Sequence, residues 1–379
     1  MDMTGQRLHI MRLVYFGTAM ALAALLGACA SPGVMTTRIA PLQGYQRLHV
    51  DDVNIHAVSA DMLAFLDHYV NPESNRDSQA WKLVWAVTDR NVLPFRYDPG
   101  LTIGPVETFA LKTGNCLAFS NMLVAMARQQ GLKAWYQEVE IPPQWNNINN
   151  TLLFSIHVNV VVQGQIDQWV VDVSGQPSTR ASKIKRISDE EALAQYYNNL
   201  GAEALTADNL PEAFAYFVKA IETQPRRAYL WSNLAVVYTR NGQFEDAKQS
   251  YLAALDMDSN TSIAANNLYL LYEKEGNFAA AETLRSRVER HRRKNPYYLY
   301  YLSMMAFDEG RFEESRDMLQ KAILLKDREY RFHYEMARTL ARQGDYAGAQ
   351  ASLDRALQLA PENTWMADTR IEDLPELPE

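Results

Sequence analysis

Cys116 lies where a helix is expected to begin, which is where a sulfur nucleophile gains most from the backbone. Thr113 or Asn115 can cap the start of this helix, and Gly131 can follow its end. Free N–H groups and the positive end of the helix dipole stabilise a thiolate in the first turn. The placement therefore predicts a cysteine nucleophile, with a buried structural cysteine as the alternative.

His157 and Asp172 lie on two expected β-strands that are joined by a short turn, so the segment is predicted to be a hairpin. If residues 164–165 form a type II′ turn, His157 faces Asp172 directly, with Cβ atoms about 4.5–5.5 Å apart. If residues 163–164 form the turn, His157 faces Val170, and Asp172 lies on the diagonal at roughly 7–8 Å. Both registers keep the imidazole and the carboxylate on one face, where the carboxylate can orient the ring.

The order of Cys116, His157 and Asp172, and the sequence around them, resemble the transglutaminase-like, papain-related superfamily of cysteine enzymes. In that superfamily the nucleophilic cysteine begins a helix, and the histidine and aspartate lie on neighbouring strands. The resemblance implies an α+β transglutaminase/papain-like domain, placed here at residues 49–188. It covers residues 75–180 and rests on the segments Phe95–Asp98, Glu107–Cys116, Gly131–Ala134, Ser155–Val158 and Trp169–Asp172.

The same resemblance implies a role for each residue of the site. Cys116 attacks an amide or thioester carbonyl, and its backbone N–H helps to bind the oxyanion. His157 takes the thiol proton and later protonates the leaving amine, while Asp172 fixes the imidazole tautomer. Trp81 and Trp85 precede the cysteine by 35 and 31 residues, where some family members keep a tryptophan near the oxyanion. Packing in the core is the expected use of both tryptophans.

The C-terminal half of the chain carries a 34-residue period. Such a helix–turn–helix period is the signature of tetratricopeptide repeats, in which glycine ends the first helix and small residues let two helices approach. We therefore expect an all-α TPR solenoid of five 34-residue repeats at residues 190–365, whose groove binds a protein or peptide. The third and fourth repeats depart from the pattern at Arg285 and Ser315. The units are 194–227, 228–261, 262–295, 296–329 and 330–363, with phased residues Gly242, Gly276, Gly310 and Gly344, and Ala220, Ala254, Val288, Ala322 and Ala356.

The first thirty residues have the pattern of a secretory signal. Arg7 and Arg12 precede an apolar run that ends in Leu26-Gly-Ala-Cys29. This ending resembles the bacterial lipobox, so we expect lipidation at Cys29, with a plain cleavage site or a short anchor helix as alternatives. The resulting order is a lipoprotein signal peptide at 1–28, a tether at 29–48 and, after the repeats, an acidic tail at 366–379. In the resembled class Ala30 favours the periplasmic face of the outer membrane over the inner membrane.

The composition limits the classes of partner and cofactor. The net charge is −8, and no basic stripe occurs, which argues against nucleic acid as a partner. No His, Cys or carboxylate spacing indicates a metal site, and no glycine-rich phosphate loop occurs, so we expect no cofactor. If Cys29 carries lipid, Cys116 is the one thiol left, and no intrachain disulfide can form.

Two functions follow as hypotheses of different class. The first is a membrane-tethered envelope cysteine enzyme that acts on amide or peptide bonds, by hydrolysis or by acyl transfer, with the repeats recruiting a protein or peptide. The second is a non-catalytic scaffold lipoprotein, in which the transglutaminase-like fold and the repeats both serve protein–protein interaction. In either case the membrane is contacted through the lipid on Cys29.

Overall fold

The computed structural model describes most of the chain after residue 37. The described ranges are 38–70, 75–139, 157–174, 184–259, 261–292, 294–360 and 371–374. All of them belong to one compact unit, Thr37–Glu379. The expectations for the signal peptide at 1–28, for Cys29 and for most of the acidic tail lie outside these residues. Among the described residues, no helix is both long enough and apolar enough to cross a membrane.

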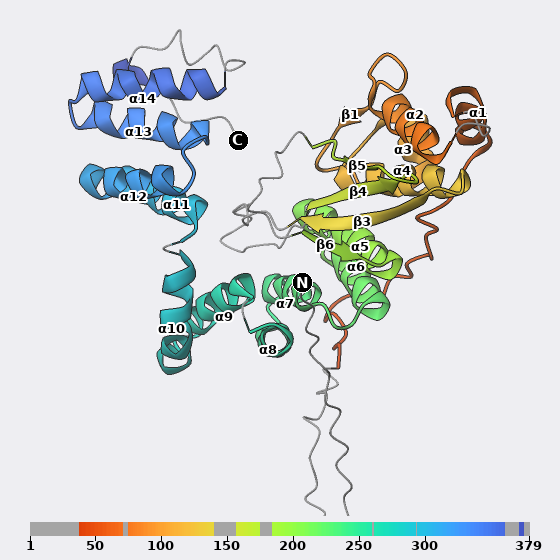
Figure 1. Cartoon of the computed structure of the whole chain (residues 1–379). Coiled ribbons are helices and arrows are strands. Elements are labelled where there is room, and N and C mark those ends of the chain that lie inside the picture. The colour runs from red at the N-terminus through yellow and green to blue at the C-terminus, as the bar shows by residue number, and fades with distance from the viewer. Residues whose placement is uncertain are drawn as a thin grey trace, which may run out of the picture. The chain divides into compact units, whose positions relative to one another are not determined.

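A small antiparallel sheet and four helices form the part of the described chain that precedes the repeats (Figure 1). The sheet has the strand order β5-β4-β3-β6, and a separate parallel pair joins β1 to β2. The elements thus mix helix and antiparallel sheet, as expected. The bounds are α1 Ala60–Tyr69, α2 Arg76–Thr88, β1 Arg96–Tyr97, α3 Pro105–Leu111, β2 Thr113–Gly114, α4 Cys116–Gln129, β3 Lys133–Val139, β4 His157–Gln163, β5 Gln168–Val171 and β6 Ile184–Ile187.

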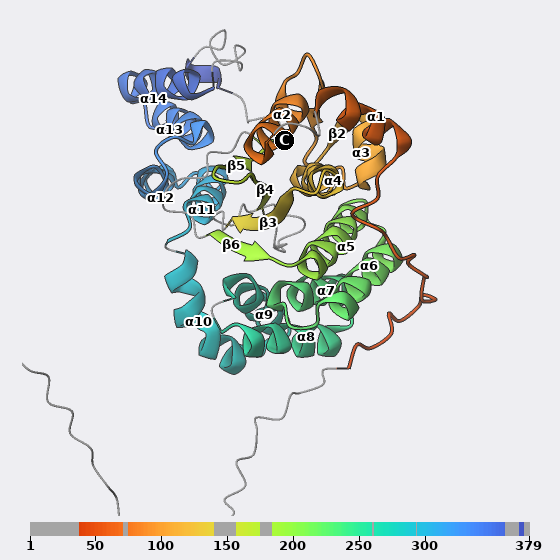
Figure 2. The ribbon, with the colours of Figure 1, turned by 45° about the vertical axis from the view of Figure 1, so that its right-hand side comes forward.

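Helix α4 is the buried helix of this part, and it packs against β3 and β4 (Figure 2). Every residue from 117 to 127 is buried, which is the environment of a helix whose surface is covered all round. Asn115 is the N-cap, because its Oδ1 accepts a hydrogen bond from the Ala118 N–H at 2.9 Å. Gly131 follows the helix with a φ of 67°. The predicted start at Cys116 and the glycine after the end are both confirmed.

The hairpin that carries His157 and Asp172 has a longer turn than either predicted register. Gln163 pairs with Gln168, so residues 164–167 form a four-residue loop. The two-residue loops predicted at 164–165 and at 163–164 were therefore both wrong. The Asp77 carboxylate of α2 explains the longer loop, because it accepts hydrogen bonds from the backbone N–H groups of residues 166 and 167, both at 3.0 Å. Extending the observed register places Asp172 on the diagonal from His157, on the same face of the hairpin.

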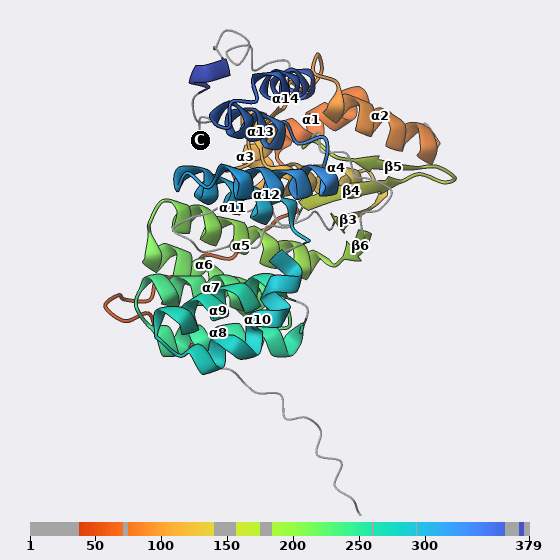
Figure 3. The ribbon, with the colours of Figure 1, turned by 90° about the vertical axis from the view of Figure 1, so that its left-hand side faces the viewer.

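Ten described helices in five consecutive pairs form the array (Figure 3). The pairs begin close to the starts of the five predicted 34-residue units, so the repeat prediction is confirmed. A 3-10 helix, Ile371–Asp373, follows within the described residues. The helices are α5 Asp189–Thr206, α6 Leu210–Thr223, α7 Ala228–Arg240, α8 Phe244–Met257, α9 Ser262–Lys274, α10 Phe278–Arg292, α11 Pro296–Asp308, α12 Phe312–Leu325, α13 Tyr330–Arg342 and α14 Tyr346–Leu359.

The phased glycines end the first helix of each later pair because they adopt a left-handed conformation. Their φ values lie between 72° and 82°, and a Cβ at any of them would meet nothing within 4 Å. Conformation rather than space therefore requires glycine there. In the first pair the equivalent position is Asp208, with a φ of 59°. The four glycines are Gly242, Gly276, Gly310 and Gly344.

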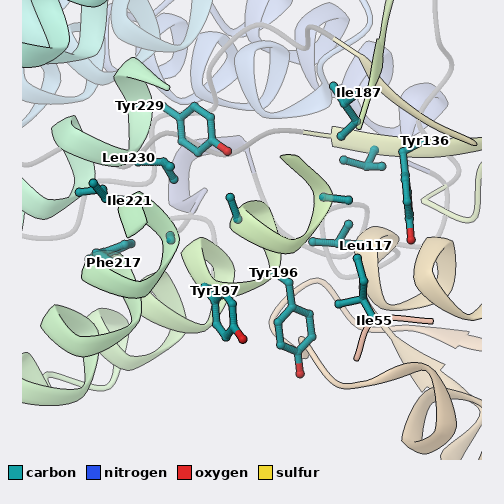
Figure 4. Packing of buried hydrophobic residues seen from close by; sticks show 14 of the residues in the cluster. Ile55, Leu117, Tyr136, Ile187, Tyr196, Tyr197, Phe217, Ile221, Tyr229 and Leu230 are labelled. Atoms are coloured by element: carbon teal, nitrogen blue, oxygen red, sulfur yellow. The ribbon is translucent and has the colours of Figure 1, made fainter. Parts of the chain in front are cut away.

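One hydrophobic core joins the sheet-containing part to the first helices of the array (Figure 4). It runs from Leu42 to Leu271 and includes Leu117 of α4, Tyr136 of β3 and Tyr197 of α5. The later helix pairs have separate, smaller clusters. The predicted boundary near residue 189 is thus a change in secondary structure across which the core is continuous.

The segment 38–48 lies against the array, which corrects the prediction that it belongs to a tether. Its carbonyl groups accept hydrogen bonds from three array side chains. Tyr238 donates to Ala40 at 2.5 Å, Asn241 to Gln43 at 3.0 Å, and Gln243 to the carbonyl of residue 41 at 3.2 Å. Polar side chains of α7 and of the turn that follows it supply partners that the sequence of the segment alone does not reveal.

Candidate cysteine site

Cys116 is the first residue of α4, and its thiol is partly exposed. The turn before it is fixed on two sides. The Asn115 N–H donates to the Leu101 carbonyl at 2.9 Å, and the Asn115 side chain donates to Thr102 Oγ1 at 2.6 Å. A Cβ at Gly114 would lie 2.8 Å from the Cβ of Ala118, so only glycine lets this turn approach the helix so closely. The cysteine is therefore held at a well-defined helix start.

His157 and Asp172 are in direct contact. His157 Nε2 and Asp172 Oδ2 are 2.5 Å apart, and the imidazole is buried. The other carboxylate oxygen of Asp172 accepts hydrogen bonds from the Ser174 N–H at 2.9 Å and from the Ser174 hydroxyl at 2.7 Å. The diagonal placement of the two residues across the hairpin thus suffices for a charge-assisted hydrogen bond. The carboxylate is oriented on both sides.

Cys116 lies close enough to His157 to influence its pKa. Burial lowers the pKa of His157, but hydrogen bonds to Asp172 and to the Cys116 thiol, with the negative charges of both groups, raise it to about 9. Burial raises the pKa of Asp172, yet the bonds from His157 and Ser174 outweigh it and hold that pKa below its ordinary value. A protonated imidazole between a sulfur and a carboxylate is the arrangement of a Cys–His nucleophile with an orienting acid.

Tyr97 is a further residue of this site that sequence reasoning did not identify. It lies on β1 and pairs with Gly114, two positions before the cysteine. Burial raises the pKa of Tyr97 to about 12, and the charges of Cys116 and Asp172 act in the same direction. The phenol therefore stays protonated and can donate a hydrogen bond at the site. Tyr97 lies within the segment 95–98, on which the family resemblance rests in part. The parallel pairing of its strand with β2 is not visible in the sequence.

Trp81 and Trp85 do not pack in the core, which corrects the expectation for both. Their side chains are 52% and 39% exposed, and their rings stack with centroids 6.2 Å apart. They lie one turn apart on α2, on the side of the helix that the core residues Ala80 and Leu83 do not use. Periodicity could have shown this, because positions 81 and 85 fall between the buried positions of α2.

Buried amides mark the first helices of the array. Asn233 of α7 donates to Asn198 of α5 at 2.8 Å. Gln195 of α5 is also buried, and within the described part of the chain neither of its side-chain polar atoms has a hydrogen-bond partner. Among the described residues, no cluster of three or more His, Cys, Asp or Glu side chains could hold a metal ion.

Comparison with known proteins identifies the array. The tetratricopeptide repeat family matches residues 216–249 and 330–363, the second of which coincides with the fifth predicted unit. The chain therefore contains tetratricopeptide repeats, and both matches lie between α6 and the residues after α14. No curated protein matches the sequence.

Three of the solved structures that match this chain each align with a little under half of it. MamA from Desulfovibrio magneticus RS-1 is 16% identical, with 46% of this chain and 98% of that chain covered and a TM-score of 0.29. YrrB, described as a TPR protein with an unusual peptide-binding site, is 18% identical, with coverages of 46% and 90% and a TM-score of 0.27. PilF of Pseudomonas aeruginosa is 20% identical, with coverages of 47% and 82% and a TM-score of 0.33.

Proposed function

We propose that this chain is a protein-binding protein with a cysteine site, in which the tetratricopeptide array recruits a polypeptide and Cys116 attacks an amide bond in it. The observation that carries the catalytic half is the 2.5 Å contact between His157 and Asp172, together with the influence of Cys116 on the pKa of His157. The binding half is supported more directly, because both family matches lie in the array.

The reaction that this arrangement supports is acyl transfer through a thioester. The Cys116 thiol first gives its proton to His157; the sulfur then bonds to the amide carbonyl carbon, and the carbonyl electrons move to oxygen. The Cys116 N–H at the start of α4, and the protonated hydroxyl of Tyr97, are the candidate donors to that oxyanion. The C–N bond then breaks, and His157 returns the proton to the leaving amine. Water or a second amine attacks the thioester, giving hydrolysis or crosslinking.

A non-catalytic scaffold is the second candidate function, and the comparisons favour it. They match the repeats alone. The continuous core from Leu42 to Leu271 also suits a binding protein, because it makes the sheet a rigid extension of the first repeats. In this case Cys116 would contribute packing and hydrogen bonding only, and its replacement would leave every function of the protein unchanged.

The proposed location is the periplasmic face of the outer membrane, with the chain anchored by lipid on Cys29. The support is the sequence alone: Arg7 and Arg12, the apolar run and the ending Leu26-Gly-Ala-Cys29. Expression in a bacterium fed a labelled fatty acid tests this. The wild type should incorporate label and sediment with membranes, and Cys29→Ser should do neither. A labelled Cys29→Ser protein would contradict the proposal.

Turnover by matched variants separates enzyme from scaffold. The full chain is incubated with a proteome-derived peptide mixture and a fluorescent primary amine, and new N-termini and amine adducts are measured. Cys116→Ala should abolish both products while leaving the melting temperature and the binding of recruited proteins intact. Equal product from wild type and Cys116→Ala would remove the catalytic half of the proposal.

A further inference from the structure

We propose that Asn159 of β4, together with Gln137 of β3, binds the backbone of the polypeptide whose amide bond Cys116 attacks. The inference rests on the proposed function, because it assigns a substrate-binding subsite to the same cysteine site. The class of ligand is an extended peptide chain, which the two side chains would recognise through its N–H and C=O groups.

The sheet places both amides beside the pair formed by His157 and Asp172. Asn159 lies two positions after His157 on β4, and alternate residues of a strand share a face. Gln137 is directly opposite Asn159 in the register between β3 and β4. Extending the register between β4 and β5 by one residue places Asp172 opposite Asn159 on its other side. A row of polar side chains therefore crosses the sheet from Asp172 through Asn159 to Gln137.

The two amides of this row are buried without hydrogen-bond partners. Asn159 is 1% exposed, and within the described residues neither its Oδ1 nor its Nδ2 has a partner. The Oε1 of Gln137 is likewise buried and has no partner there. A fold loses stability when it leaves buried polar atoms unpaired, so such atoms require an explanation. Their place beside His157 points to a ligand that supplies the missing bonds.

The unpaired atoms match the hydrogen-bonding groups of an extended peptide. Asn159 offers one acceptor and an NH2 donor, and Gln137 offers a second acceptor. A residue in an extended chain presents its own N–H and C=O on the same side, so one side-chain amide can bond both. A second N–H of the peptide can reach Gln137, because directly opposed residues have Cβ atoms only about 4.5–5.5 Å apart. A polypeptide that reaches these atoms gains hydrogen bonds to them without breaking existing ones.

Gln195 of α5 provides a matched control. It is 3% exposed, and in the described part of the chain both of its polar atoms lack partners, as those of Asn159 do. It lies in the array and not in the sheet. An apolar replacement should therefore remove an unpaired amide at either position, but weaken peptide binding beside His157 only at Asn159.

The test compares two reagents that carry the same chloromethyl ketone group. Acetyl-trialanine chloromethyl ketone has a peptide chain, and chloroacetone has none. With either reagent the Cys116 sulfur bonds to the methylene carbon and chloride leaves, so the ratio of the two rates reports the contribution of the peptide. Labelling is followed across pH 5–9 on the tryptic peptide that contains Cys116, in full-chain wild type, Asn159→Leu, Gln137→Met and Gln195→Met. Melting temperatures accompany the rates.

Asn159→Leu should lower the ratio of the peptide rate to the chloroacetone rate about tenfold, and Gln137→Met about threefold, as expected for the loss of two hydrogen bonds and of one. The chloroacetone rate should stay at its wild-type value in both variants. Melting temperatures should not fall, because an apolar side chain of similar shape replaces an unpaired amide. Gln195→Met should leave the ratio unchanged.

A wild-type ratio in Asn159→Leu, or an equal fall in Gln195→Met, would overturn the inference. A matching fall in the chloroacetone rate of Asn159→Leu would also overturn it, because the residue would then act on the thiol and not on the peptide. The proposed function fails separately, if chloroacetone labels the wild type only near pH ~8.5, as it would a free thiol. In that case the ratio still decides whether Asn159 and Gln137 bind a peptide.

Discussion

The beginning and the end of the repeat array use one sequence pattern but differ in how they are held. Helices from α5 to α9 share the core that runs from Leu42 to Leu271. The last helices rely on clusters of a few residues each, such as Tyr334, Ala337, Leu353 and Ala356. This difference shows that the apolar side chains of a repeat are buried mainly by contact with the elements that flank it. The early repeats share this core with α4, the helix that begins at Cys116, and the late repeats do not.

Polar contacts follow the same division. In the early region Arg227 joins α7 to the sheet through Glu138 at 2.5 Å and to α5 through Glu191 at 3.3 Å. Among the described residues of the late region, Ser315 of α12 and Thr339 of α13 have their hydroxyl oxygens 3.1 Å apart. Ser315 stands where alanine is usual, and this partner explains how a hydroxyl is tolerated in a buried position.

The largest effect is expected from a large-to-small substitution, which leaves a cavity, at equivalent positions of the early and late regions. Phe217 and Leu353 occupy the same place in the first and fifth repeats and are both buried. Phe217→Ala should cost about 3–5 kcal/mol and Leu353→Ala about 2–5 kcal/mol. When thermal unfolding is followed by calorimetry and by labelling of Cys116, only Phe217→Ala should expose Cys116 at a lower temperature than the wild type does. Early exposure of Cys116 in both variants would mean that the array unfolds as one unit.

Protonation of His157 should stabilise only the early region. The folded pKa of about 9 lies above the unfolded value of ~6.5, so the group binds its proton more tightly in the folded state. Its contribution is fully present below pH ~6.5 and is lost as the pH rises towards 9. The difference in unfolding free energy between wild type and His157→Gln should shrink over that window, as measured by denaturant unfolding. A difference that stays constant with pH would contradict the assignment.

Replacing a phased glycine by alanine should lower the free energy of unfolding by a similar amount in the two regions. Gly242 and Gly344 have φ values of 75° and 82°, and a Cβ at either meets no atom within 4 Å. Alanine at either site should therefore cost about 1–2 kcal/mol, the price of a left-handed residue, with no added clash. Urea unfolding measures both costs. A much larger cost at Gly242 would show that burial in the common core adds to the backbone effect.

The smallest effect expected is that of the ion pair between Arg128 and Asp189. Both side chains are more than a third exposed, so solvent screening limits the loss in Asp189→Asn to about 0.5–1 kcal/mol. The hydrogen bond from Arg128 lowers the pKa of Asp189. The contribution is therefore present above the unfolded pKa of ~3.9 and is lost as the pH falls through the folded value. Unfolding curves at pH 7 and pH 3 should show a smaller difference between wild type and variant at pH 3 than at pH 7.

Local patterns were predictable from the sequence, and long-range pairings were not. The 34-residue period foretold the helix pairs, and the positive φ of Gly242 explains why glycine recurs. The capped start of α4 at Cys116 followed from the adjacent Asn115. The prediction that His157 and Asp172 lie on one face of the hairpin was correct. Side chains alternate between the two faces of a strand, and a change of turn length by two residues preserves this alternation.

The turn length itself was wrong because it depends on Asp77, which is nearly ninety residues from the turn. Tyr97 was missed because its strand pairs in parallel with a two-residue strand that has no signal of its own. The segment 38–48 was misjudged because its partners, such as Gln243, lie about two hundred residues later. In each case the local structure depends on partners elsewhere in the chain that the local pattern does not reveal.

The most direct test of a coupled Cys116–His157 pair is the pH dependence of iodoacetamide labelling at Cys116 in the full chain, with His157→Ala beside it. A sulfur coupled to His157 should label rapidly at pH 7 and below, and the histidine variant should lose this reactivity. Labelling in both proteins that rises only near pH ~8.5, as for a free thiol, would contradict the account and leave the repeats as the functional part of the molecule.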